Sequence, residues 1–271
     1  MNFNGLEFSD YLNVFQKFSW GEWIIFSLVV NLFLYLFSIG LYLFVDKTCR
    51  KDKLQKKDHT VTKSDFLLSL LTVICNSFIM LLGVVLWKSE WITLDNNTPA
   101  GIIFLEVVAL IFLMDFCMYL FHYAAHAPSI YKMLHGKHHE HISTNFLSLF
   151  VLHPFETIGF GLMMIVLLMC YNFSLTAIVI YLTINLIWGT IGHLNREFFP
   201  AKFDRMGIGT TRFHNLHHLD ESKNFGFIPL SGIGFSELIE IRITNPDAKL
   251  FCCLHYLQTR QRQNQTFHLK F

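Results

Sequence analysis

The chain has 271 residues, of which 53% are hydrophobic and only 15% are charged, and its mean hydropathy is +0.42. Soluble domains usually carry about 25% charged residues, so the composition favours an integral membrane protein. The net charge is +1 and no basic run is interleaved with aromatic residues. We therefore expect no nucleic-acid partner.

Apolar runs predict the membrane spans. The first three runs cover residues 24–45, 66–87 and 101–121, and each is long enough for a transmembrane helix of about 20 residues. A fourth apolar region, 157–192, is too long for one span, and Cys170-Tyr171-Asn172 divides it. We expect a helical hairpin there. The sequence thus predicts an all-α integral membrane protein with about four transmembrane helices, three spans plus the hairpin, under a histidine-rich helical cap.

Basic residues predict the orientation in the membrane. The loop 88–100 has one lysine, whereas the segment 46–65 has seven basic residues: Lys47, Arg50, Lys51, Lys53, Lys56, Lys57 and Lys63. The positive-inside rule places the basic loop in the cytoplasm. Counting spans from there, the third run ends in the cytoplasm and everything after His193 is cytoplasmic too. The membrane would be the endoplasmic reticulum in a eukaryote and the inner membrane in a bacterium.

Eight of the fourteen histidines fall into three tight clusters, all on the predicted cytoplasmic side. Neutral imidazole is a common metal ligand, and spacings of three or four residues place side chains on one helix face. Eight imidazoles exceed the needs of a single tetrahedral site, so we expect more than one metal ion. The clusters are His122 and His126; His135, His138 and His139; and His214, His217 and His218.

Other polar residues near the clusters have alternative roles by sequence. His153 and His193 lie at the two mouths of the hairpin, and each is either a further ligand or an ordinary helix-end histidine. We expect a non-ligand surface role for His141 and a solvated position for His59. Asp115 lies within the third span, where a carboxylate needs a partner. That partner is either an imidazole of a metal ligand or a group elsewhere.

Several other kinds of site are excluded. A zinc protease helix requires His-Glu-x-x-His, but Ser143 stands where the second histidine would be. The span interiors hold no histidine for haem ligation. The six cysteines include no Cys-x-x-Cys pair, which argues against iron–sulfur or zinc-ribbon ligation.

Further motifs accompany the clusters in a fixed order between residues 115 and 228. They are Asp115, His122-x3-His126, His135-x2-His138-His139, His153-Pro154-x-Glu156, Gly192-His193, and His214-x2-His217-His218 followed by Asn224-Phe225-Gly226. In this order they resemble the fatty acid hydroxylase/sterol desaturase superfamily of membrane non-haem di-iron oxygenases. The chain departs from that pattern at Asn215, where many members have aspartate, and in lacking a Trp-Asp ending.

The resemblance implies an enzyme with two iron ions, with zinc possible in a purified or crystallised form, that uses O2 to hydroxylate or desaturate a lipid. It raises His153 and His193 to ligands beside the eight clustered histidines, and it implies that Asp115 and Glu156 orient imidazoles. The lipid would be a sterol or carry a fatty acyl chain. No side chain is expected to act as a nucleophile or general base.

The resemblance also implies a partner, because the chain has no redox domain of its own. Electrons would come from a carrier of the cytochrome b5, ferredoxin or rubredoxin type, with Lys132 and Lys137 as candidate docking residues. We expect membrane spans and loops at 1–100, the catalytic region at 101–230 and a cytoplasmic tail at 231–271. The alternatives are a metal-binding or metal-transporting membrane protein, and a non-catalytic regulatory paralogue.

Overall fold

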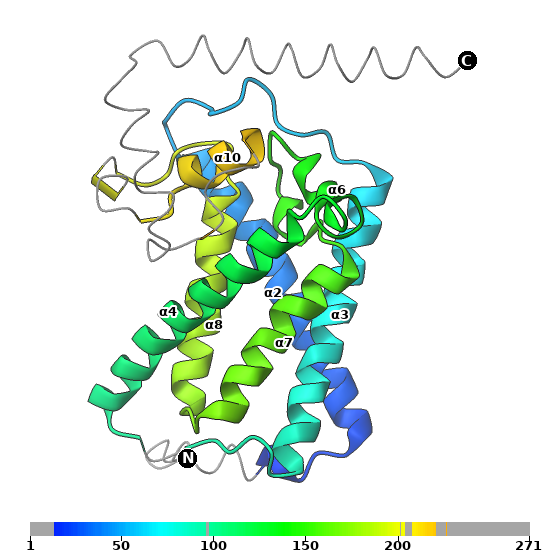
Figure 1. The fold of residues 1–271 in the computed structure, drawn as a ribbon, viewed down its shortest axis with the longest axis vertical. Coiled ribbons are helices and arrows are strands. Elements are labelled where there is room, and N and C mark those ends of the chain that lie inside the picture. The colour runs from blue at the N-terminus through cyan, green and yellow to red at the C-terminus, as the bar shows by residue number, and fades with distance from the viewer. Residues whose placement is uncertain (1–13, 96–97, 201, 204–207, 221–225, 227–271) are drawn as a thin grey trace, which may run out of the picture. The chain divides into compact units, whose positions relative to one another are not determined.

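The computed structural model describes residues 14–95, 98–200, 202–203, 208–220 and 226, and the predicted C-terminal tail lies outside these residues. The described part is helical, with long helices side by side and short helices gathered at one end (Figure 1). The long helices are α2 (Trp20–Thr48), α3 (Lys63–Lys88), α4 (Ala100–Ala125), α7 (Pro154–Cys170) and α8 (Leu175–Gly192). The short ones are α5 (Tyr131–Leu134), α6 (Gly136–His139), η1 (Ser148–Phe150) and α10 (Thr211–Leu219).

Helices α2 and α3 begin with the same capping arrangement. Ser19 accepts a hydrogen bond from the backbone N–H of Glu22, whose carboxylate accepts one from the backbone N–H of Ser19. Thr62 and Asp65 repeat this capping box at the start of α3. A capping box satisfies backbone donors that a helix start leaves unpaired. Asp65 is therefore held in a defined position in the first turn of α3.

The predicted hairpin is formed by α7 and α8. Pro154 occupies the first position of α7, where its missing N–H would have had no helical partner. Ser174 caps α8 by accepting a hydrogen bond from the backbone of Ala177. The turn between the helices follows Cys170, where the apolar region was expected to divide.

The helices pack closely and share hydroxyl contacts. Helix α3 packs against α2 and α7, and α8 packs against α2 and α4. A Cβ added at Gly161 of α7 would lie 2.6 Å from the side chain of Ile79 in α3, so these two helices approach where only glycine fits. Ser38 and Thr190 form a hydrogen bond of 2.7 Å between α2 and α8. Small residues and hydroxyl pairs of this kind are typical of helix contacts in membranes.

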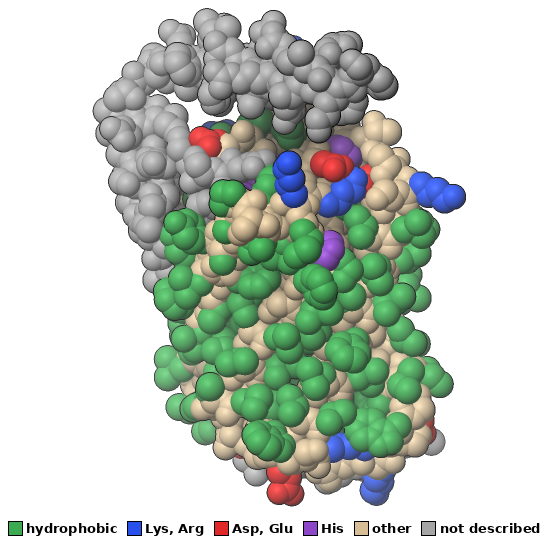
Figure 2. Space-filling model, turned by 45° about the vertical axis from the view of Figure 1, so that its right-hand side comes forward, with side chains coloured by type: hydrophobic (Ala, Val, Ile, Leu, Met, Phe, Trp, Pro, Cys, Tyr) green, Lys and Arg blue, Asp and Glu red, His purple; other side chains and the backbone are tan. Residues whose placement is uncertain are grey.

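The outward faces of the helices are apolar. Phe33, Phe78 and Phe116 are each more than half exposed although they lie in the interior of long helices. In Figure 2 hydrophobic side chains cover the middle of the molecule, and charged side chains lie toward its two ends. Helices α2, α3, α4 and α8 are long and apolar enough to cross a membrane, and α7 is a shorter apolar helix. These features confirm the predicted all-helical membrane architecture.

The loop between α2 and α3, residues 49–62, is bonded to three distant segments. The backbone of Gln55 donates to Asn195 Oδ1 at 2.8 Å, beyond the end of α8, and its side chain donates to Asn215 Oδ1 of α10 at 3.0 Å. The carbonyl of His59 accepts from Asn145 Nδ2 at 3.1 Å. We call this segment the α2–α3 loop. It links the parts of the chain that carry the histidines.

Candidate metal centre

The histidine-bearing segments meet at one end of the long helices (Figure 1). His122 lies in the last turn of α4 and His126 follows at its C-cap. The short helices α5 and α6 come next, and the N-cap residue Thr210 fixes the start of α10 by accepting from the backbone of Phe213. His193 is the C-cap residue of α8. The predicted gathering of the clusters on one side is therefore confirmed in the structure.

The first histidine set draws on all three clusters. One ring nitrogen from each member lies within 4.8 Å of every other. The Nε2 atoms of His122 and His135 are 2.8 Å apart, and those of His122 and His217 are 3.0 Å apart. The side chains are buried except for the half-buried His126. The members are His122, His126, His135, His139 and His217.

The second histidine set has four members, all buried, whose donor nitrogens also lie within 4.8 Å of one another: His138, His193, His214 and His218. The Nε2 atom of His214 is 3.0 Å from that of His193 and 3.0 Å from that of His218. The Nδ1 atoms of His138 and His218 are buried without a hydrogen-bond partner. Four imidazoles are thus concentrated in one buried place, and a ring nitrogen of two of them, His138 and His218, has no hydrogen-bond partner.

The spacing of these nitrogens fits metal coordination. An imidazole nitrogen binds a transition metal at about 2.1 Å, so two such ligands at a right angle are about 3.0 Å apart. The shortest nitrogen pairs, at 2.8–3.0 Å, match that separation in both sets. Donors made only of imidazole suit iron, zinc, copper or nickel. The residues of both sets therefore fit bound metal ions.

Burial keeps these imidazoles neutral and able to ligate. Loss of solvent lowers the pKa of His126 to about 4, and the same effect lowers the pKa of His193 to about 4. The pKa values of His138, His214 and His218 are lowered well below the ordinary value, first by burial and then by neighbouring histidines. A neutral imidazole offers the lone pair that a metal requires.

Two further groups orient imidazoles from outside the sets. Glu156 Oε1 lies 2.6 Å from His135 Nδ1, with 1% and 2% of the two side chains exposed. The Gly189 carbonyl accepts a hydrogen bond of 2.7 Å from His193 Nδ1. Such bonds to Nδ1 assign the proton there and turn Nε2 toward the metal position. The expected orienting contact of Glu156 is confirmed, whereas that of the buried Asp115 stays a prediction.

Nine of the ten histidines expected as ligands belong to one of the two sets. The tenth, His153, is half-buried at the N-cap of α7, where its Nδ1 accepts a hydrogen bond of 3.3 Å from the backbone of Phe155. Among the described residues, the grouped donor side chains do not include His153. Ligation by each of the ten histidines remains a prediction.

The surface role expected for His141 is wrong. Its side chain is completely buried, because Nδ1 bonds to Ser148 Oγ at 2.8 Å and Nε2 faces Asp65. His59 is only partly solvated, with 23% of its side chain exposed, and its ring stacks on His141 with centroids 3.9 Å apart. Sequence reasoning missed Asp65, although the Thr62-x-x-Asp65 capping pattern could have placed it at a helix start beside this loop.

Comparison with known proteins finds relatives of the region that carries the histidine sets. A family model described as fatty acid hydroxylase matches residues 107–232. Protein CER1-like 2 of Arabidopsis thaliana is 35% identical over 129 residues, which are 43% of this chain and 21% of that protein. The very-long-chain aldehyde decarbonylase GL1-5 of Oryza sativa subsp. indica is 30% identical over 128 residues, 43% of this chain and 20% of that protein.

A sterol-modifying relative is also found. The Delta(7)-sterol 5(6)-desaturase of Leptosphaeria maculans is 25% identical over 123 residues, 45% of this chain and 33% of that protein. The chain thus matches only a fifth to a third of the length of these curated relatives. No solved structure matches the chain significantly.

The matched region, 107–232, contains every member of both histidine sets. The sets are consistent with the metal site typical of the matched family. The order of the motifs, their convergence at the end of apolar helices and the match itself agree, and residues 107–232 are similar to the fatty acid hydroxylase family.

Proposed function

We propose that this protein is a membrane-bound, O2-dependent oxidoreductase that hydroxylates or desaturates the hydrocarbon part of a lipid. The observation that carries the proposal is the pair of buried imidazole sets at one end of a bundle of apolar helices. Nine neutral nitrogen donors in two groups are more than a folded core requires. Their place beside lipid-facing helices supports a substrate drawn from the bilayer.

The protein's own residues hold and shield the centre. The five histidines of the first set would together hold one metal ion, and the four of the second set would hold another. Both ions would be iron in the active protein. Bound iron supplies the O2 chemistry that side chains lack. Glu156 and the Gly189 carbonyl fix the imidazole orientations, and burial of the sets excludes bulk water. We further propose that this end faces the cytoplasm and receives electrons from a separate carrier protein.

A second candidate reaction follows from the relatives. One relative is named as a very-long-chain aldehyde decarbonylase and another as a sterol desaturase. Both names specify largely apolar substrates, which suits the lipid-facing helices of this chain. A long-chain aldehyde is therefore a second substrate class to test beside sterols and fatty acyl lipids.

A role in ion transport is less well supported. Transport through the bundle would require ionisable groups along several spans. In the described spans, the carboxylates in helix interiors are Glu106 and Asp115, and both lie in α4. Glu106 Oε2 accepts hydrogen bonds from the backbone and hydroxyl of Ser174, at 3.0 and 2.6 Å. This carboxylate thus secures the start of α8.

The test combines metal analysis with turnover in the full chain purified in detergent and loaded anaerobically with Fe²⁺. We expect two irons per chain in the two sets and O2 consumption that depends on a reductant and on an added sterol, acyl lipid or aldehyde. His138→Ala should abolish turnover, because it removes a donor from the second set. Lys57→Gln, at an exposed loop position outside both sets, is the control and should retain turnover. Wild-type turnover by His138→Ala or by a metal-free protein would exclude the proposal.

A further inference from the structure

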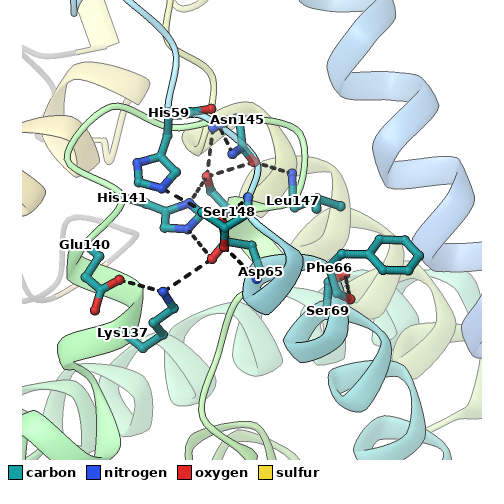
Figure 3. A network of polar contacts seen from close by, with 11 residues as sticks. His59, Asp65, Phe66, Ser69, Lys137, Glu140, His141, Asn145, Leu147 and Ser148 are labelled. Atoms are coloured by element: carbon teal, nitrogen blue, oxygen red, sulfur yellow. Dashed lines mark hydrogen bonds and ion pairs between the residues drawn. The ribbon is translucent and has the colours of Figure 1, made fainter.

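A third group of donor side chains lies outside both histidine sets. It consists of His59 from the α2–α3 loop, Asp65 from the first turn of α3, and His141, which follows α6 (Figure 3). One donor atom from each lies within 4.8 Å of the other two. The side chains of Asp65 and His141 are completely buried, and that of His59 is 23% exposed. Two segments far apart in sequence, residues 59–65 and the segment that follows α6, therefore bring two imidazoles and a carboxylate together.

The donor atoms in this group lie at or beyond the outer limit of hydrogen-bond distance. His141 Nε2 lies 3.4 Å from Asp65 Oδ1, and His59 Nε2 lies 3.9 Å from Asp65 Oδ2. Both His141 Nε2 and Asp65 Oδ1 are buried atoms without a hydrogen-bond partner. Two ligands bound at about 2.1 Å on neighbouring corners of a tetrahedron are about 3.4 Å apart. The buried pair is thus spaced as ligands of one ion would be.

A hydroxyl orients the ring of His141. Ser148 Oγ lies 2.8 Å from His141 Nδ1 and accepts from the backbone N–H of Asn145 at 2.8 Å. The tautomer of His141 that can bind a metal ion through Nε2 carries its proton on Nδ1 and donates it to Ser148 Oγ. Nε2 then presents a lone pair to the Asp65 carboxylate. Two acceptors that face each other in a buried place need a cation between them.

We propose that His59, Asp65 and His141 bind a further divalent metal ion of the zinc class, separate from the two histidine sets. Two imidazoles and a carboxylate are a ligand set that zinc commonly takes, with water in the fourth position. The Ser148 bond to His141 Nδ1 is the outer contact that orients such a ligand. His141 follows His139 by two residues, so the ion would fasten the α2–α3 loop to the segment that carries the second cluster.

Lys137 is the cation that competes for this place. Its Nζ lies 3.4 Å from Asp65 Oδ1, and at 2.5 Å it donates to Glu140 Oε2 (Figure 3). The ammonium therefore has a second carboxylate to which it can turn fully when a metal ion binds Asp65. If Lys137 and Asp65 form only a structural ion pair, removing the lysine should leave zinc affinity unchanged or weaker. If Asp65 binds a metal ion, removing the lysine should make zinc bind more tightly.

The experiment measures Zn²⁺ binding to the full chain in detergent, by equilibrium dialysis followed by metal analysis. Wild type should bind one zinc ion more than His59→Gln, a change at a partly exposed loop residue. Lys137→Gln should bind that zinc about two- to fivefold more tightly, since it removes one partly exposed competing charge. Lys57→Gln, at an exposed position of the same loop, should match wild type in both measurements.

Equal zinc content in wild type and a folded His59→Gln protein would overturn the proposal. If His59→Gln does not fold, Lys137→Gln still decides, because it keeps all three ligands. Zinc affinity that is unchanged or weaker in Lys137→Gln would then overturn the site. The inference does not rest on the proposed function: an inactive protein that still shows the difference of one zinc ion supports it.

Discussion

The contact between Glu156 and His135 should make the affinity of the first histidine set depend on one carboxylate. The two side chains are almost fully buried and their polar atoms are 2.6 Å apart. A carboxylate opposite Nδ1 raises the basicity of Nε2, the nitrogen that faces the set. Glu156→Gln preserves the size of the side chain and an oxygen acceptor, but it removes the charge.

Loss of such a partner weakens metal binding by about 10- to 100-fold, equivalent to about 1.4–2.7 kcal/mol. His135 belongs to the first set only, and the second set should keep its affinity. In Glu156→Gln, one of two bound ions should therefore leave at lower chelator concentration, which metal analysis after stepwise chelation measures.

The matched control is Glu90→Gln, which removes a carboxylate from an exposed position just beyond the end of α3. Its two ions should leave at the same chelator concentrations as those of wild type. Identical chelation curves for Glu156→Gln and wild type would refute the reasoning. Equal weakening of both ions would refute the division of the histidines into two sets.

Two further predictions concern the stability of the fold. Gly161→Ala should lower the stability of the detergent-solubilised protein by about 1–3 kcal/mol, because its Cβ would lie 2.6 Å from the side chain of Ile79. Gly83→Ala, at a position with open space around it, should cause no loss of stability. Equal melting temperatures for the two variants would contradict the packing argument. The metal-free protein should lose stability as the pH falls from 6.5 toward 4, because His126 and His193, with folded pKa values of about 4, stay neutral while the unfolded chain takes up protons. A melting temperature that is constant over this range would show that their burial is not maintained without metal.

The helices could be predicted because span length and apolar composition are local properties. The run 24–45 lies within α2 (Trp20–Thr48), and the run 66–87 lies within α3 (Lys63–Lys88). The helices extend beyond the runs where capping residues such as Ser19 and Thr62 satisfy the first backbone donors. Hydropathy alone does not register those polar ends.

The third donor group could not be predicted in the same way. The α2–α3 loop is polar and charged, and this composition predicts a solvated side chain for His59. Its burial against His141 arises from contacts between segments far apart in sequence, such as the bond from Asn145 to the His59 carbonyl. His153 shows the converse case, because this motif position caps α7 and lies outside both histidine sets, so its expected ligation stays a prediction.

Spacing predicted the histidine clusters but not how they are shared. Helical residues four apart lie about 40° apart around the axis, whereas adjacent residues lie about 100° apart. In the second cluster the i,i+4 pair joins the first set and His138 joins the second set. In α10 the assignment is reversed, since the i,i+4 pair joins the second set and His217 joins the first.

Each His-x-x-His-His motif therefore contributes to both sets, and neither set is complete until both motifs are in place. His122 and His126 add a second pair to the first set, while His193 adds a single donor to the second, which explains five members against four. Because one short segment and one nine-residue helix span both sets, the two sites are coupled through their ligands. The contacts that hold those segments, including the α2–α3 loop bonded to α10 through Gln55 and Asn215, consequently act on both sites at once.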